Sequence, residues 1–273
     1  MKTFFFFVTL VIFFFGCKKD KDNNKNKQLY LSKVFNDGLL ESEYFYDADK
    51  KAYRRNDYTT TNGVSTYAGF RLYEYNSNKL LETMTLFYKN NVFAQKYRIQ
   101  YDANKKPTRL DDLANDNSLQ WYHIFDYNLQ GDFSKYSIFN AGTNKKTIEA
   151  TFSYNDNHKL TKMIRMNYSN NPATKFDSST YSFNSKTLPA SWNCFETFVF
   201  GSLPTGDRTF MDMTLDSSFY YYVDAPPTTN RATFSAKQYN SDGYLIKQHF
   251  NYKVTGSLSS STIDFDKTYE YIQ

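Results

Sequence analysis

Cysteine is scarce in this chain of 273 residues, which contains only Cys17 and Cys194. A secreted domain held together by disulfides carries an even set of cysteines at framework spacings, so that class of fold is excluded. Cys194 stands in a strand-like stretch, and a nucleophilic role would need a histidine and an orienting group that the sequence does not assign. We therefore expect a half-buried thiol at Cys194.

Motifs for catalysis and metal binding are also missing. His123, His158 and His249 lie far apart, and none has a second His or Cys at ligand spacing. The sequence contains neither a glycine-rich phosphate loop nor a Gly-x-Ser-x-Gly elbow. Acidic turn strings such as NSDG lack the bidentate glutamate of a calcium loop. We predict a protein that is not an enzyme and that has no metal and no cofactor. An enzyme with a site assembled across repeats is the less favoured alternative.

The net positive charge of the chain comes mostly from its first 29 residues. The formal net charge is +5, but Lys2 supplies one of these charges and residues 18–29 hold five lysines against two aspartates. The remaining sequence has 27 basic and 26 acidic residues. A nucleic-acid-binding domain concentrates positive charge on its folded surface. We therefore expect no nucleic acid partner.

A single long apolar run extends from Phe4 to Phe15 and is followed by Gly16 and Cys17. Its twelve residues fall short of the roughly 20 that a membrane-spanning helix needs. They suit the apolar part of a secretory signal that has a small residue before the cleavage site. With cysteine directly after Gly16, the stretch resembles a bacterial lipoprotein signal. The resemblance implies that residues 1–16 are removed and that Cys17 carries the lipid, while ordinary secretion and an uncleaved anchor are the alternatives.

The segment after Cys17 reads KKDKDNNKNKQL and offers almost nothing to bury. Polar, charged segments of this kind stay disordered, so residues 17–29 are expected to form a lipidated cysteine and a flexible tether. Twelve flexible residues reach roughly 20 Å, enough to hold a domain formed by residues 30–273 away from a lipid surface. The expected location is the cell envelope, anchored by lipid to the outer membrane, on either its periplasmic or its surface face.

Aromatic residues are abundant, at 19% of the chain, and they recur with a period. Tyr and Phe favour strands because their rings pack well on a half-buried pleated surface. An aromatic residue, in most copies followed by Asp or Asn, returns at intervals of 26 to 29 residues, with one interval of 56 and one of 32. These repeat anchors are Tyr46, Tyr75, Tyr101, Tyr127, Tyr154, Phe183, Tyr239 and Tyr271. Such a steady period marks a repeat architecture, and the interval of 56 predicts a further copy near residues 210–212.

The residue just before each anchor is polar in seven of the eight copies, and another large apolar residue usually precedes it. Apolar, polar, apolar is the alternation of a strand with one solvated face. Asn, Asp, Ser, Lys and Gly then form a turn, and a second alternating stretch follows. The pattern predicts an all-β fold, an antiparallel meander of about nine β-hairpin repeats of about 27 residues. So many strands favour a curled or layered open sheet.

The aromatic-Asp turns resemble the YD or RHS-type repeats, whose units carry a Tyr-Asp anchor at an early turn. The likeness covers roughly residues 40–273 and is greatest to short lipid-anchored versions in Bacteroidota-like envelopes. Several copies have Asn in place of Asp, and Phe183 replaces tyrosine. The resemblance therefore supports the architecture and assigns no particular activity.

The favoured function is that of a non-catalytic, lipid-anchored envelope protein. Its aromatic-rich β-repeat surface is expected to bind a glycan, a peptide or a partner protein. The alternative is a structural or assembly accessory of an outer-membrane complex. The least regular part, residues 195–235, contains the proline loops GSLPTGDR and DAPPTTN. These loops are candidate functional protrusions or, alternatively, long hairpin connections.

Overall fold

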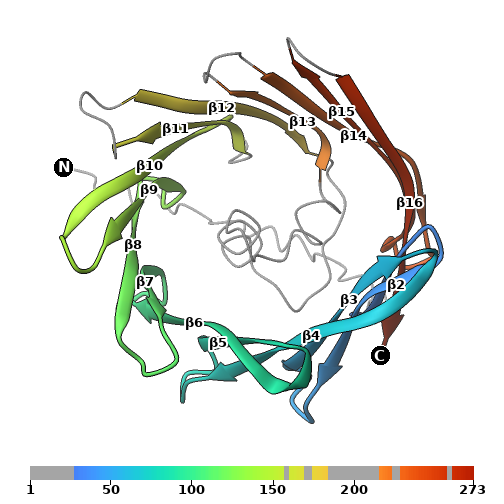
Figure 1. Ribbon diagram of the computed structural model, residues 1–273, viewed down its shortest axis with the longest axis horizontal. Helices are drawn as coiled ribbons and strands as arrows, with labels where there is room; N and C mark the ends of the chain where they lie inside the picture. The colour runs from blue at the N-terminus through green and yellow to red at the C-terminus, as the bar shows by residue number, and fades with distance from the viewer. Residues whose placement is uncertain (1–27, 157–159, 169–173, 184–214, 223–227, 257–259) are drawn as a thin grey trace, which may run out of the picture.

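The computed structural model describes residues 28–156, 160–168, 174–183, 215–222, 228–256 and 260–273, and these form sixteen strands arranged in a ring (Figure 1). In chain order the strands are β1 (Tyr30–Asn36), β2 (Leu39–Tyr46), β3 (Ala52–Thr61), β4 (Val64–Tyr75), β5 (Leu81–Tyr88), β6 (Val92–Tyr101), β7 (Pro107–Leu113), β8 (Leu119–Tyr127), β9 (Phe133–Asn140), β10 (Lys145–Tyr154), β11 (Leu160–Asn167), β12 (Thr174–Phe183), β13 (Leu215–Tyr222), β14 (Thr228–Tyr239), β15 (Leu245–Gly256) and β16 (Ser260–Ile272).

Every one of these strands pairs antiparallel with its neighbours in the chain, which confirms the prediction of an all-β antiparallel meander. The expected curling goes further than an open sheet, because β1 also pairs with β16 and the strands form a closed barrel. The seam runs from Tyr30 opposite Ile272 to Asn36 opposite Lys267. Pairing the first and last strands satisfies backbone groups that an open sheet would leave along two edges.

One interval between anchors, the 56 residues from Phe183 to Tyr239, is much longer than the others. Strand β12 pairs directly with β13, and β13 pairs directly with β14. The additional copy predicted near residues 210–212 lies outside the described residues, as do the loop GSLPTGDR and most of the loop DAPPTTN. In the described sheet, β13 is therefore the one strand between β12, which ends at Phe183, and β14, which ends at Tyr239.

The sheet has two faces of different character. In β6, Tyr97 and Ile99 are buried while Arg98 and Gln100 are exposed. We call the side that carries Tyr97 the packed face and the side that carries Arg98 the polar face. The main core cluster lies on the packed face and contains Ala52, Tyr73, Leu81, Met84, Leu86, Tyr97, Ile99, Leu110, Phe125, Tyr136, Ala150, Leu160, Met163, Ala232 and Phe234.

Helix contributes little to the described part of the chain. A single turn of 3-10 helix, η1 (Lys89–Asn91), connects β5 to β6. Among the described residues, no helix has both the length and the apolar character needed to cross a membrane.

Candidate binding site

Each described hairpin turn that follows an anchor begins with the Asp or Asn next to it. In the turn between β4 and β5, the Asn76 side-chain oxygen accepts from the Leu80 backbone N–H at 3.1 Å, and the Lys79 N–H donates to the Asn76 carbonyl at 2.8 Å. Equivalent bonds form in the turns that begin at Asp47, Asp102, Asn128 and Asn240. Because the turn uses one side-chain oxygen and no charge, Asn serves as well as Asp.

The fourth residue of these turns adopts a positive φ, which explains which residues stand there. The φ angle is +88° at Gly131 and +82° at Gly243, where glycine has no steric cost. The other turns place Lys50, Lys79 and Lys105 in the same conformation, with φ between +61° and +64°. The repeat therefore keeps its turn geometry even where glycine is absent.

The anchor tyrosines connect neighbouring hairpins through their hydroxyl groups. The pairing of β5 with β6 stops at Thr83 opposite Arg98, and beyond that point the Tyr101 hydroxyl donates to the Leu81 carbonyl at 2.7 Å. The same bond joins Tyr46 to Leu31, Tyr75 to Ala52, Tyr127 to Pro107, Tyr154 to Phe133 and Tyr271 to Leu245, at 2.6 to 2.9 Å. Each bond bridges a notch where two hairpins diverge next to the turns.

The two remaining anchors, Tyr239 and Phe183, each end a strand. Tyr239 ends β14 and packs against the second core cluster, which contains Leu31, Val34 and Leu245 among its buried residues. Phe183 ends β12, and its side chain lies outside the described part. The described anchors are thus half-buried and hydrogen-bonded or packed, so their rings do not form a free row on the surface.

The fifth residue of two of these turns is a lysine that lies over the anchor ring of the following hairpin. Lys51 Nζ lies 4.3 Å from the ring centre of Tyr75, and Lys106 Nζ lies 4.9 Å from that of Tyr127. Between β5 and β6 the corresponding residue is Leu80, which is shorter than lysine and uncharged. The notch that has leucine in place of lysine contains an open pocket.

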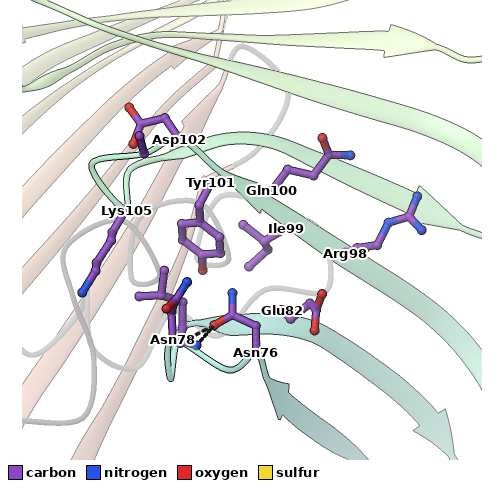
Figure 2. Close-up of a pocket in the computed structure, with 11 residues that line it drawn as sticks. Asn76, Asn78, Glu82, Arg98, Ile99, Gln100, Tyr101, Asp102 and Lys105 are labelled. Atoms are coloured by element: carbon purple, nitrogen blue, oxygen red, sulfur yellow. Dashed lines mark hydrogen bonds between the residues drawn. The ribbon is translucent and has the colours of Figure 1, made fainter.

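The pocket in this notch has a volume of about 510 Å³ (Figure 2). Its lining comes from two successive turns and from the diverging ends of β5 and β6, and consists of Asn76, Asn78, Leu80, Glu82, Arg98, Ile99, Gln100, Tyr101, Asp102, Ala103 and Lys105. Two cations and two carboxylates balance each other, and three amide side chains add donors and acceptors. The pocket is therefore suited to an uncharged polar ligand group.

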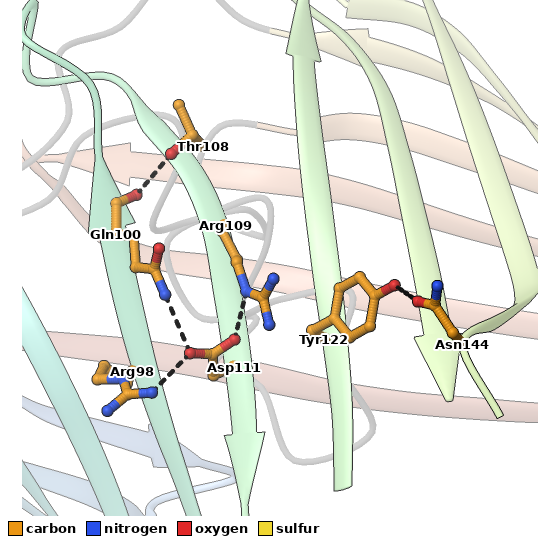
Figure 3. Close-up of polar contacts among 7 residues, drawn as sticks. All are labelled: Arg98, Gln100, Thr108, Arg109, Asp111, Tyr122 and Asn144. Carbon is orange, nitrogen blue, oxygen red and sulfur yellow. Dashed lines mark hydrogen bonds and ion pairs between the residues drawn. The ribbon is translucent and has the colours of Figure 1, made fainter. Parts of the chain in front are cut away.

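Arg98 and Gln100 connect this pocket to a polar cluster on the neighbouring strand (Figure 3). Asp111 accepts from Arg109 Nε at 2.6 Å, from Arg98 Nη2 at 2.9 Å and from Gln100 Nε2 at 3.1 Å. Burial opposes ionisation of this carboxyl, but the hydrogen bonds from Arg109 and Arg98 hold the pKa of Asp111 below its ordinary value. The Asp111 side chain is 2% exposed, whereas that of Arg98 is 50% exposed, so the arginine remains available to a ligand.

Aromatic rings continue the polar cluster across the sheet. The Arg109 guanidinium lies 4.4 Å from the ring centre of Tyr122, and Tyr122 stacks on Phe139 with ring centres 4.9 Å apart and an interplanar angle of 4°. Arg98, Asp111, Tyr122 and Phe139 are opposite one another in register on β6 to β9. We call these four residues, together with Arg109, the lateral row. Flat rings beside guanidinium groups can stack on a sugar ring or on a planar side chain.

The packed face carries ionisable groups of a different kind. His123 Nδ1 lies 2.8 Å from the Tyr136 hydroxyl, and both side chains are buried. Burial lowers the pKa of His123 to about 4, and Asp111 only partly opposes this shift. Burial also raises the pKa of Asp112, which lies on the same face, to about 6. Within the described ranges, no group of three His, Cys, Asp or Glu side chains is placed to hold a metal ion.

Comparison with known proteins places the fold. No protein-family model matches the sequence, and no curated protein matches it. Among solved structures, a porin-like protein from Bacteroides uniformis has a TM-score of 0.53 at 10% identity, covering 85% of this chain and 90% of that one. A porin-like protein from Bacteroides vulgatus has a TM-score of 0.42 at 9% identity, covering 89% and 99%. The TcdB2-TccC3-Cdc42 structure has a TM-score of 0.31 at 9% identity, covering 86% and 14%. The first likeness shows a shared fold.

The residues of the lateral row were not singled out by the repeat pattern, which follows the packed face. The sequence pattern marked Gln100 as the solvated residue between Ile99 and Tyr101. Applying the same alternation two residues earlier gives Arg98. The alternation could therefore have assigned Arg98 to the polar face, but its contact with Asp111 depends on strand register.

Proposed function

We propose that this protein is a non-catalytic, lipid-anchored envelope protein that acts by binding a glycan, a peptide or a partner protein through its polar face. The observation that carries the proposal is the continuity of the pocket with the lateral row through Arg98. It offers hydrogen-bonding groups and stacked rings side by side, as recognition sites for sugars and peptide side chains require. The fold shared with a porin-like Bacteroides protein supports an envelope setting.

A structural or assembly accessory of an outer-membrane complex is the second candidate. It is favoured by the use of the anchor tyrosines, whose hydroxyl groups bond to neighbouring backbone and whose rings pack against the core. Because these rings pack within the sheet, the anchors do not form a binding row by themselves, although Tyr101 lines the pocket. The two candidates differ in whether a ligand contacts the lateral row.

A binding experiment on the full chain in detergent separates these candidates. Glycan arrays and capture from envelope extracts should detect a ligand for the wild-type protein, with at least tenfold weaker binding by Arg98→Ala and by Tyr122→Ala. Lys253→Ala and Tyr53→Ala remove an exposed cation and an exposed ring from other strands and should bind like the wild type. Ligand binding that is unchanged by both lateral-row variants would refute the site, and absence of any ligand would favour the accessory role.

Lipid anchoring is the second part of the proposal and is supported by the sequence from Phe4 to Cys17. Cys17 lies outside the described residues, so this part depends on the apolar run, Gly16 and the polar tether. Metabolic lipid labelling and membrane fractionation should show that Cys17→Ser loses its label and leaves the membrane fraction. Cys194→Ser is the matched control and should keep both. Unchanged labelling and membrane retention of Cys17→Ser would rule out the anchor.

A further inference from the structure

Two of the notches between diverging hairpins are filled by a lysine of the chain itself. Lys51 Nζ lies 4.3 Å from the ring centre of Tyr75, and Lys106 Nζ lies 4.9 Å from that of Tyr127. The same ammonium groups donate hydrogen bonds to the carbonyl of the fourth residue in the next turn, Lys79 and Gly131 respectively. A cation over an aromatic ring is attracted by the negative face of the ring. The repeat therefore contains a recurrent site for an ammonium group, and its occupant is a lysine side chain.

The notch between β5 and β6 has the same surroundings without the lysine. Tyr101 provides the anchor ring, Lys105 is the fourth residue of the next turn, and both line the pocket. Leu80 stands at the fifth position of the preceding turn and carries no donor group. Figure 2 shows Ile99 and Tyr101 projecting from β6 toward that turn. The pocket thus combines an aromatic ring with two apolar side chains, Leu80 and Ile99, that suit the four-carbon stem of a lysine.

Glu82 gives this notch a negative charge that the two other notches lack. It stands two residues after Leu80 and lines the pocket. The residues at the same distance after Lys51 and Lys106 are uncharged, namely Tyr53 and Thr108. Glu82 is exposed, and its carboxylate makes no ion pair with another described residue. A cationic ligand group would supply the partner that this carboxylate lacks within the described part of the chain.

The other charges of the pocket also favour a cation. The balance of charge over the whole lining, which suits an uncharged group, includes Arg98. Arg98 is held by Asp111 from the neighbouring strand at 2.9 Å. Without Arg98, the carboxylates of Glu82 and Asp102 are opposed by Lys105 alone. The rest of the pocket therefore has one negative charge in excess.

We propose that this pocket binds a lysine side chain of a partner polypeptide, with the ammonium group over the Tyr101 ring and beside Glu82 and the stem on Leu80 and Ile99. The inference rests on the proposed binding function and specifies the ligand of that same site. A lysine is favoured over the amine of an amino sugar because lysine side chains fill the two equivalent notches. The apolar side chains next to the ring also suit a hydrocarbon stem better than a hydroxylated sugar ring.

Saturation-transfer difference NMR with the full chain in detergent tests the proposal. The probe is the tripeptide Gly-Lys-Gly with an acetylated amino terminus and an amidated carboxyl terminus. We expect a saturable signal on its lysine methylene protons. Acetylation of the lysine removes the charge and should weaken binding at least tenfold. Absence of saturable binding by the tripeptide would overturn the proposal, and tighter binding of methyl glucosaminide would overturn the choice of a polypeptide.

The matched variants are Leu80→Lys and Leu80→Ala. Leu80→Lys places in this notch the lysine that Lys51 and Lys106 supply elsewhere, so it should fold, fill the pocket and bind the tripeptide at least tenfold more weakly. Leu80→Ala keeps the notch open and should bind within about threefold of the wild type, because the ring and the carboxylate supply most of the attraction. Unchanged binding by Leu80→Lys, or an equal loss in both variants, would contradict the lysine site.

Capture from envelope extracts distinguishes failure of this inference from failure of the proposed function. Leu80→Lys leaves Arg98 and the rest of the lateral row in place. Both Leu80→Lys and prior acetylation of the lysines in the extract should reduce capture of the ligand at least tenfold. Capture that is weakened by Arg98→Ala but not by Leu80→Lys or by acetylation would support the proposed function and refute the lysine site.

Discussion

Replacing Tyr154 with aspartate should unfold the barrel, whereas the same change at the adjacent Ser153 should leave it folded. Tyr154 packs against the main core cluster, and its hydroxyl donates to the Phe133 carbonyl at 2.7 Å. Ser153 is exposed. Loss of a large core aromatic costs about 3–5 kcal/mol, and desolvating a carboxylate in its place adds to that cost. Because a domain is typically stable by only about 5–15 kcal/mol, Tyr154→Asp removes most of this stability.

Urea and thermal unfolding followed by circular dichroism measure this difference. Tyr154→Phe is a useful third variant because it removes only the hydroxyl bond to Phe133, which is typically worth about 1 kcal/mol. The expected order of stability is wild type and Ser153→Asp first, then Tyr154→Phe, then Tyr154→Asp. Equal melting temperatures for Tyr154→Asp and Ser153→Asp would show that the two faces of β10 are assigned incorrectly.

The second large effect is a pH dependence that comes from His123. Burial lowers its pKa to about 4 from an ordinary value of 6.5. Between these values the unfolded chain binds a proton that the folded chain does not, so the free energy of unfolding falls as the pH falls from 6.5 to 4. The shift corresponds to about 3 kcal/mol. The His123→Gln variant lacks this loss. Its free energy of unfolding, relative to that of the wild type, should therefore be about 3 kcal/mol higher at pH 4 than at pH 7.

Two further variants make this measurement specific. Burial raises the pKa of Asp112 to about 6, so its protonated form stabilises the fold below that pH and the contribution is lost as the pH rises through 6. Asp112→Asn should thus show the opposite trend to His123→Gln. The hydrogen bond to Asp266 raises the pKa of the partly exposed His249, so the stabilisation from His249 is also present at low pH and lost at higher pH. A pH-independent difference between the wild type and His123→Gln would refute the assignment.

The hairpins were predictable because their causes are local. Alternation of apolar and polar residues selects strands, and one Asp or Asn after the anchor supplies the turn oxygen, as Asn76 does for Leu80. Closure was not predictable, because it depends on the pairing of Tyr30 with Ile272, two residues at opposite ends of the repeat domain. The period gives the strands and turns, while the seam depends on how far the assembled sheet curls.

The candidate site depends on residues that differ between repeats. A search for the features that the repeats share does not reveal such residues. The pocket occurs where Leu80 stands in the position that Lys51 and Lys106 occupy elsewhere. The burial of Arg55 and Arg71 was also not predictable from the sequence, because both stand at positions of the packed face, where the alternation predicts apolar residues. Both arginines form ion pairs with Asp57, which lies in the same phase.

Closure also affects how the protein is made. The seam joins β1, the first of the described strands in chain order, to β16, the last of them. Until β16 has been synthesised, β1 and the most recently formed strand each present a row of unpaired backbone groups to other chains. The completed ring removes both rows at once, because all sixteen described strands then have hydrogen-bonded neighbours on both sides. Protection against strand exchange and aggregation therefore arises only when the whole repeat domain has been translated.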